Sequence, residues 1–409
     1  MRAPAELSVL DLVPVPSGST AAEAIGNSID LSRQAERLGY KRYWFAEHHL
    51  NPGVVGVSPP VVIALVAAAT TTIRIGSGGV QLGHRTALSV VEEFGLLDAV
   101  HPGRLDLGLG RSVGRPAPRT DGSAPTLSPA AAQAAAEGVT ANGLIIPKRF
   151  PIERLLRSPR VGLQKQLLML PHAESPDYGE QVSDILALLR GDYRSPDGLE
   201  ARVIPGEGAD VQVWILGSSG GQSAEVAGTN SLRFAANYHV SPATVLEAVD
   251  GYRGAFRSSA ELERPYVAVS ADVVVADDED HARQLAAGYG AWVLSIRNAS
   301  GAIPYPTPAE ARAHVWCDED RELVADRLAT QFVGTAAQVV AQLRRLEEAT
   351  GADELVITTI THDHLDRVRS YELLAEEWYR DHLDVSAEQA GDPLPGGRRS
   401  RWAVARGLA

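Results

Sequence analysis

Residues 42–49 read Arg-Tyr-Trp-Phe-Ala-Glu-His-His, and this short run is the strongest single indication of the architecture. Its aromatic segment is typical of a buried β-strand. The run ends abruptly in Glu47, His48 and His49, and such side chains are costly to bury without partners. In α/β proteins, ligands bind at the carboxyl ends of the strands. The run therefore predicts either a polar strand end hydrogen-bonded into the fold or one wall of an active site.

An alternation of apolar runs and amphipathic helices extends from this strand in both directions. The expected strands are residues 7–12, 42–46, 73–82, 104–110, 211–216, 232–236, 266–275 and 354–359. A helical pattern follows each of them, most clearly over residues 21–38. Strands that alternate with helices through short turns indicate a parallel sheet with crossover helices. Eight such units predict an α/β fold, a (β/α)8 TIM barrel over residues 1–382.

Two segments interrupt this repeat. Residues 112–160, after the fourth strand, are dominated by Pro, Ser, Thr, Ala and Arg and lose the apolar periodicity, which predicts a mobile insertion or lid. Residues 296–330, after the seventh strand, are expected to form a second insertion. Residues 383–409 have the composition of a disordered tail.

The bulk properties are those of an ordinary soluble globular protein, with 44% apolar and 22% charged residues. The net charge of −13 argues against a nucleic-acid partner, because phosphate contacts need Lys and Arg. The single cysteine, Cys317, excludes an internal disulfide framework and fits a reducing cytoplasm. We see no signal peptide, and the apolar runs are too short to span a bilayer. We therefore expect a cytoplasmic protein with no membrane contact.

Residues at the strand ends should line one mouth of the barrel. Gly78 and Gly79 interrupt the third strand, where glycines usually mark a bulge or the close approach of a ligand. The loop 217–221, Gly-Ser-Ser-Gly-Gly, precedes a helix whose N-terminal N–H groups and dipole favour phosphate. A serine N-cap alone would give the same pattern. Arg111, after the fourth strand, could pair with that phosphate or with an acidic neighbour.

Four of these segments together resemble the bacterial luciferase-like flavin monooxygenases. They are the aromatic strand that ends in Glu-His-His (44–49), Ile-Arg-Ile-Gly-Ser-Gly-Gly-Val (73–80), Pro-Gly-Arg-Leu-Asp-Leu-Gly-Leu-Gly-Arg (102–111) and Ile-Leu-Gly-Ser-Ser (215–219). The segments stand in the family's order. The resemblance covers residues 7–110 and 175–380.

The resemblance implies a flavin-dependent monooxygenase that uses reduced FMN and O2 to oxygenate a small organic substrate through a flavin C4a-(hydro)peroxide. A separate flavin reductase would supply the reduced FMN, and the family often forms homodimers. His48 matches the catalytic histidine and Glu47 the acid beside the flavin. Gly78 and Gly79 match a strained, often cis, peptide under the isoalloxazine ring.

The resemblance also implies a phosphate clamp made by Arg111, Ser218 and Ser219. The luciferases proper carry an acidic residue at the position of Gly217. We therefore expect the clamp here to depend more on backbone N–H groups.

Three other functions are compatible with parts of this sequence. A relative with the same fold could use FMN or the deazaflavin F420 without oxygenase activity, because fold does not fix chemistry. A serine hydrolase could use the loop 217–221 as a nucleophile elbow, with His239 or His362 as base. A metal enzyme could use Glu47, His48 and His49, but successive side chains on a strand point to opposite faces, so we expect no metal.

Overall fold

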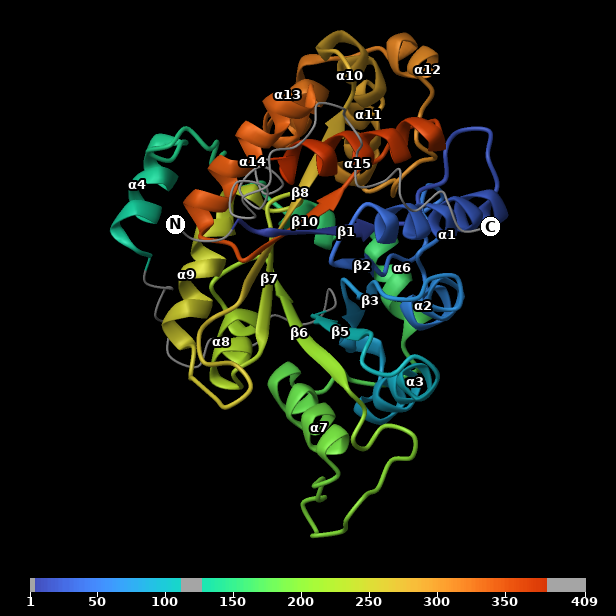
Figure 1. Cartoon of the computed structure of the whole chain (residues 1–409), viewed down its shortest axis with the longest axis vertical. Coiled ribbons are helices and arrows are strands. Elements are labelled where there is room, and N and C mark those ends of the chain that lie inside the picture. The colour runs from blue at the N-terminus through green and yellow to red at the C-terminus, as the bar shows by residue number, and fades with distance from the viewer. Residues whose placement is uncertain (1–3, 112–126, 381–409) are drawn as a thin grey trace, which may run out of the picture.

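The computed structural model describes residues 4–111 and 127–380, and in these ranges eight parallel strands close into a barrel (Figure 1). The barrel strands are β1 (Glu6–Asp11), β2 (Arg42–Phe45), β3 (Arg74–Ser77), β5 (Leu105–Gly110), β6 (Val211–Gly217), β7 (Arg233–Asn237), β8 (Val267–Val275) and β10 (Glu354–Thr358). Closure is complete because β10 pairs with both β1 and β8. The predicted (β/α)8 barrel is confirmed.

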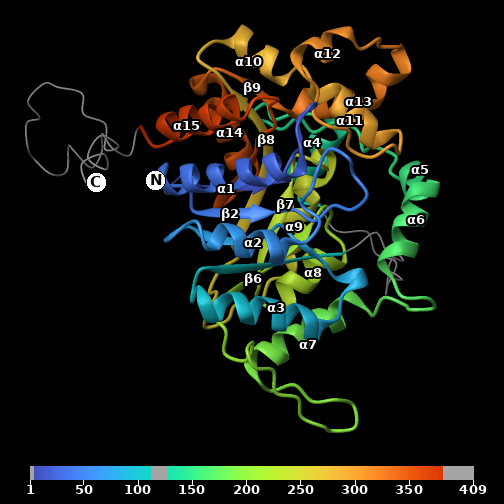
Figure 2. The ribbon, with the colours of Figure 1, turned by 90° about the vertical axis from the view of Figure 1, so that its right-hand side faces the viewer.

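Helices cover the outside of the barrel, one after each strand (Figures 1 and 2). They are α1 (Ala21–Arg37), α2 (Pro59–Ala67), α3 (Ala87–Val100), α7 (Tyr178–Arg190), α8 (Gln222–Thr229), α9 (Val245–Ala255), α14 (Ala336–Thr350) and α15 (His364–Trp378). Local sequence sets their ends. A capping box between Thr20 and Glu23 starts α1, and Gly191 in the left-handed conformation ends α7.

The third predicted strand is divided at its two glycines. After β3, the peptide between Gly78 and Gly79 is cis, as the family resemblance implied, and the chain resumes as β4 (Val80–Gln81) beside β5. A Cβ atom on Gly78 would lie 2.7 Å from Leu10 Cδ1, and one on Gly79 would lie 2.6 Å from the carbonyl oxygen of Gly108. The packing therefore leaves no room for a side chain at either position.

The barrel interior is filled in layers. At the N-terminal end of the strands, Arg42 pairs at 2.9 Å with both Asp106 and Glu354. The next layer is apolar, and the rings of Trp44 and Trp214 meet edge to face at 4.9 Å. One end is thus closed by ion pairs and the middle by packed rings, so a ligand site belongs at the C-terminal mouth.

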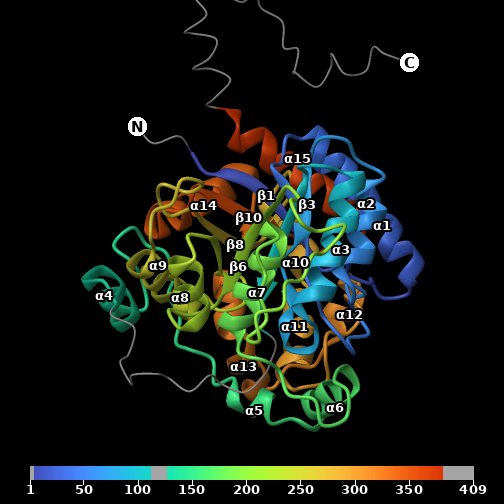
Figure 3. The ribbon, with the colours of Figure 1, turned by 90° about the horizontal axis from the view of Figure 1, so that it is seen from below.

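The two predicted insertions are present, but they contain more regular structure than the sequence indicated. The segment after β5 includes α4 (Pro129–Glu137), α5 (Glu153–Leu156) and α6 (Pro159–Leu168), and the segment after β8 includes α10 (Glu279–Ala286), α11 (Tyr289–Arg297), α12 (Pro308–Ala313), α13 (Asp318–Thr330) and β9 (Phe332–Gly334). Figures 2 and 3 show α5, α6, α12 and α13 at the same end of the molecule. Residues 112–126 of the first insertion and the predicted tail 383–409 lie outside the described residues.

The first insertion is fastened to the barrel by Arg160 of α6. Its guanidinium donates hydrogen bonds to the carbonyl oxygen of Leu50 and, at 2.9 Å, to Oδ1 of Asn51. Asn51 in turn donates to the carbonyl oxygen of His49. The insertion therefore contacts the loop that carries the predicted catalytic histidine.

None of the helices in the described ranges combines the length and the apolar composition that a membrane-spanning segment needs.

Candidate active site

Glu47 follows β2 and is 3% exposed, with its carboxylate enclosed by donors. Oε1 lies 2.8 Å from His49 Nε2 and 3.1 Å from His84 Nε2, while the Gln81 N–H donates to Oε2 at 2.9 Å. Burial alone would raise the pKa of Glu47, but these bonds and the charge of Arg85 lower it to about 2. Glu47 is therefore an ionised anchor that ties the end of β2 to β4.

The side chain of His48 has a different environment from that of Glu47. Its backbone N–H donates to the carbonyl oxygen of Gly56 at 2.9 Å, and its ring nitrogens have no hydrogen-bond partner among the described residues. Burial, with the nearby charge of His49, lowers the pKa of His48, and the charge of Glu47 opposes this only in part. The imidazole is therefore neutral at pH 7 and free to accept a proton from a ligand.

His239, after β7, also belongs to this mouth. Its Nδ1 lies 2.5 Å from Ser270 Oγ, which fixes the ring. Burial, together with the charges of Arg327 and His48, lowers the pKa of His239 to about 3. His239 is therefore a second neutral imidazole within electrostatic range of His48.

Glu47, His49 and His84 have the residue types of a metal site, since their candidate ligand atoms all lie within 4.8 Å of one another. The carboxylate is, however, already satisfied by N–H donors, and Arg85 Nε lies 3.8 Å from Oε1. A guanidinium at that distance opposes a bound cation. Hydrogen bonds and ion pairs account for the cluster, and we assign no metal to it. The side chains of Glu47 and His49 point to the same side as His84, whereas the side chain of His48 points away, because successive side chains of an extended chain alternate in direction.

The loop after β6 presents unused donors to the same end of the barrel. The backbone N–H groups of Ser218, Ser219 and Gly221 have no hydrogen-bond partner in the described part of the chain. Arg111, after β5, donates to Oε1 of Gln222 in the first turn of α8 at 3.3 Å. The structure thus brings Arg111 to the glycine- and serine-rich loop, an arrangement suited to an anion.

The geometry of a serine hydrolase is not assembled in these ranges. Neither Ser218 nor Ser219 makes a hydrogen bond to a histidine among the residues described. His239 is held by Ser270, and His362 Nε2 lies 3.0 Å from the carbonyl oxygen of Ser17. A nucleophile and its base should lie within hydrogen-bond reach of each other.

Sequence reasoning missed several polar groups of the inner wall. On β10, Thr358 follows Glu354 and Val356 on the inward face, and its buried Oγ1 has no hydrogen-bond partner among the described residues. Oδ1 of Asn237, at the end of β7, is also buried and accepts no hydrogen bond within residues 4–111 and 127–380. Buried polar groups are normally satisfied, so these atoms fit a bound molecule that offers hydrogen bonds. Alternation along the strands was the signal that could have found them.

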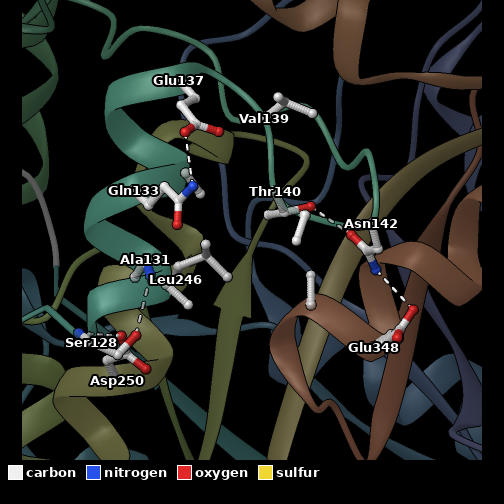
Figure 4. Close-up of a pocket in the computed structure, with 14 residues that line it drawn as sticks. Ser128, Ala131, Gln133, Glu137, Val139, Thr140, Asn142, Leu246, Asp250 and Glu348 are labelled. Atoms are coloured by element: carbon white, nitrogen blue, oxygen red, sulfur yellow. Dashed lines mark hydrogen bonds between the residues drawn. The ribbon is translucent and has the colours of Figure 1, made fainter.

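A separate hollow of about 250 Å³ lies outside the barrel between α4, α9 and α14 (Figure 4). Its polar side chains are bonded to one another. Gln133 donates to Glu137 at 2.8 Å, and Asn142 donates to Glu348 at 3.0 Å. We assign no ligand to this hollow.

The sequence also matches a known protein family. The luciferase-like monooxygenase family matches residues 5–136 and 183–354, and the chain belongs to this family. An uncharacterised protein of Bacillus subtilis, YvbT, is 35% identical over 91% of this chain and 96% of its own length. A luciferase-like monooxygenase of Escherichia coli is 33% identical over 94% of this chain and 98% of its own.

Solved structures share the fold. Apo-MsnO8 has a TM-score of 0.70 and 30% identity, and the match covers 91% of this chain and 98% of that one. The oxygenating constituent of 3,6-diketocamphane monooxygenase from Pseudomonas putida, in complex with FMN, has a TM-score of 0.58 at 18% identity over 91% of this chain and 98% of that one. An F420-dependent secondary alcohol dehydrogenase has a TM-score of 0.55 at 14% identity over 92% and 99%. At these lower identities the likeness is one of fold.

Proposed function

We propose that this protein is an FMN-dependent monooxygenase, which uses reduced FMN and O2 to oxygenate a small organic substrate. One observation carries the proposal. His48, whose ring has no hydrogen-bond partner among the described residues, and the loop at Ser218 and Ser219, whose N–H groups could bind an anion, both follow barrel strands of a chain in the luciferase-like monooxygenase family. When bound, reduced FMN supplies the electrons that activate dioxygen.

The cofactor would be held at both of its ends. The free N–H groups of Ser218, Ser219 and Gly221, which follow directly on Gly217, face the phosphate, with the guanidinium of Arg111 as its counter-charge. Gly78 and Gly79 carry no side chains and leave a flat backbone surface for the ring system. The unpartnered Thr358 and Asn237 oxygens offer hydrogen bonds at the inner wall.

His48 would move the proton. Its unprotonated ring nitrogen would accept a proton from the substrate, and the protonated ring could then return that proton. Glu47 lies beside the flavin in this proposal and acts through the groups that it orients. Its carboxylate fixes Gln81 next to the two glycines, and fixes His49 next to His48.

The apolar layer below the mouth favours chemistry that must exclude water. Leu10, Leu12, Ala46 and the Trp44–Trp214 pair are all buried in one cluster. A water-excluded pocket protects reactive oxygen species from loss to solvent. A small, largely apolar substrate fits such a pocket. The insertion that carries α6 would cover it as a lid.

A second copy of the chain and a flavin reductase are the proposed partners. Helices α2 and α3 lie against each other and carry exposed apolar side chains on their outer faces, among them Val61, Leu65, Leu96 and Val100. Contiguous exposed apolar side chains typically mark a protein contact, so we infer that a homodimer covers this surface. A reductase would deliver reduced FMN only transiently, and this supply suits a cytoplasmic enzyme.

The test is anaerobic titration with reduced FMN, followed by the addition of O2 and a panel of apolar thioethers, ketones and alkanes. We expect reduced FMN to bind and O2 uptake to yield oxygenated product. The His48→Gln variant should still bind FMN but form little product. Failure of the wild-type protein to bind reduced FMN would reject the proposal.

The alternative cofactor is the deazaflavin F420, because an F420-dependent dehydrogenase shares the barrel. Parallel titration with reduced F420 separates the two candidates. Tight binding of F420 with no O2 uptake would favour an oxidoreductase without oxygenase activity.

A further inference from the structure

The outer wall of the Gly-Ser-Ser-Gly-Gly loop is helix α9. Thr244, just before this helix, donates a hydrogen bond to the carbonyl oxygen of Ser218. Gly251 packs so closely that a Cβ atom on it would lie 2.7 Å from the Cα of Gly220. The position and shape of the loop are therefore set directly by α9.

Glu247, in the first turn of α9, reaches into the same loop. The backbone N–H of Gly220 donates to Oε1 of Glu247 at 3.2 Å. This donor is thereby turned away from any anion bound by Ser218, Ser219 and Gly221. Among the described residues, Glu247 makes no ion pair with Lys, Arg or His, so its negative charge is not neutralised locally.

The charge balance around the loop is unusual for a phosphate site. Arg111 contacts Gln222 in the first turn of α8, whereas three carboxylates lie nearby: Glu247 on Gly220, Glu225 in that same turn, and Asp177, which accepts a hydrogen bond from Gln222. The N-terminus of a helix favours an anion, and a neighbouring carboxylate opposes a second one. The loop is thus built to recognise a phosphate but to hold it weakly.

We propose that Glu247 is an affinity-determining residue for the phosphate of the flavin and keeps that phosphate exchangeable. The inference rests on the proposed function and deepens it, because a flavin delivered by another protein must also leave after each turnover. The ligand class is a phosphomonoester of a flavin. Glu247 would weaken the binding of the flavin phosphate and would not affect the binding of the isoalloxazine ring.

The test compares FMN with riboflavin, which lacks the phosphate, in the wild-type protein and in Glu247→Gln. Glutamine keeps an oxygen for the Gly220 N–H and removes the charge. We expect the affinity for FMN to rise about tenfold, with the affinity for riboflavin unchanged within about twofold. Glu263→Gln removes the same charge from an exposed position on the segment between α9 and β8 and should change neither affinity.

Two further readouts keep the result interpretable. Glu247→Ala also removes the acceptor, so a loss of FMN affinity in both variants would show that Glu247 orders the loop, and would overturn the inference. Equal gains for FMN and riboflavin would also overturn it, because the effect would not act through the phosphate. Thermal unfolding of each variant confirms that it is folded. If the wild-type protein binds neither flavin, the proposed function itself fails, whereas an unchanged FMN-to-riboflavin ratio rejects only the role of Glu247.

Discussion

Replacement of Glu47 by glutamine should destabilise the protein by about 3 kcal/mol at neutral pH. Three N–H groups converge on the carboxylate, from His49, His84 and Gln81. Glutamine offers one acceptor oxygen and places an NH2 group opposite at least one of these donors. Each charge-assisted hydrogen bond contributes about 1.5–3 kcal/mol. The fall in the pKa of Glu47 from 4.5 to about 2 gives a similar magnitude, about 3 kcal/mol.

The same residue predicts a pH dependence with a definite sign. The folded-state pKa of Glu47 lies below its unfolded value, so its stabilisation is present above about pH 4.5 and is lost as the pH falls towards 2. The assay is urea unfolding followed by circular dichroism at pH 7.5, 5 and 3.5. The difference in the free energy of unfolding between the wild-type protein and Glu47→Gln should be smaller at pH 3.5 than at pH 7.5. A constant gap, or equal stability at pH 7.5, would refute the reasoning.

A matched control is available at Glu36. Its carboxylate also accepts backbone N–H groups, from Thr71 at 2.9 Å and Ile73 at 3.0 Å, and these bonds outweigh burial to lower the pKa of Glu36 to about 2. Glu36 lies on α1, outside the mouth. Glu36→Gln should reduce stability without changing flavin affinity, whereas Glu47→Gln should reduce both.

Three further outcomes are expected. Gly79→Ala would place its Cβ 2.6 Å from the Gly108 carbonyl oxygen, so we expect a loss of at least about 2 kcal/mol, and a melting temperature equal to wild type would contradict this. His48→Gln should keep the wild-type urea midpoint and lower turnover at least about 100-fold. Because the pKa of His48 is lowered, wild-type activity that needs the neutral imidazole should persist below pH 6.5. A loss of activity centred at or above pH 6.5 would count against the role of His48. Leu96→Glu, on the exposed face of α3, should yield a monomer in light scattering, and an unchanged dimer mass would exclude that surface as the interface.

The barrel could be predicted because its strands are buried on both faces and read as continuous apolar runs. The run around Tyr43 and Trp44 is of this kind, and Val267–Val275 is also buried throughout although Ser270 and Asp272 interrupt its apolar residues. Helix α4 was missed because its alanine-rich sequence has high helix propensity but no apolar stripe. Strand β9 is three residues long and forms only by pairing with the C-terminal end of β8, a contact that no local pattern encodes.

The site was predictable at the level of strand ends and not at the level of contacts. Glu47 and His48 follow β2, and the loop after Gly217 follows β6, so barrel topology alone places them at one mouth. That Glu47 is engaged by His84 depends on how the chain turns after the cis glycine pair. The role of Glu247 depends on the packing of α9 against α8, which is set by tertiary structure.

Arg160 joins the first insertion to the barrel loop at Leu50 and Asn51. The insertion and the barrel can therefore evolve at different rates. The barrel carries the candidate site, and the segment that carries α6 is attached to it by side-chain contacts that include the guanidinium of Arg160. Replacement of that segment by another of different length or polarity would leave the strands and their ion pairs intact, provided that the docking arginine is retained. A lineage could acquire new substrates by exchanging this module, and a protein engineer could do the same by grafting it.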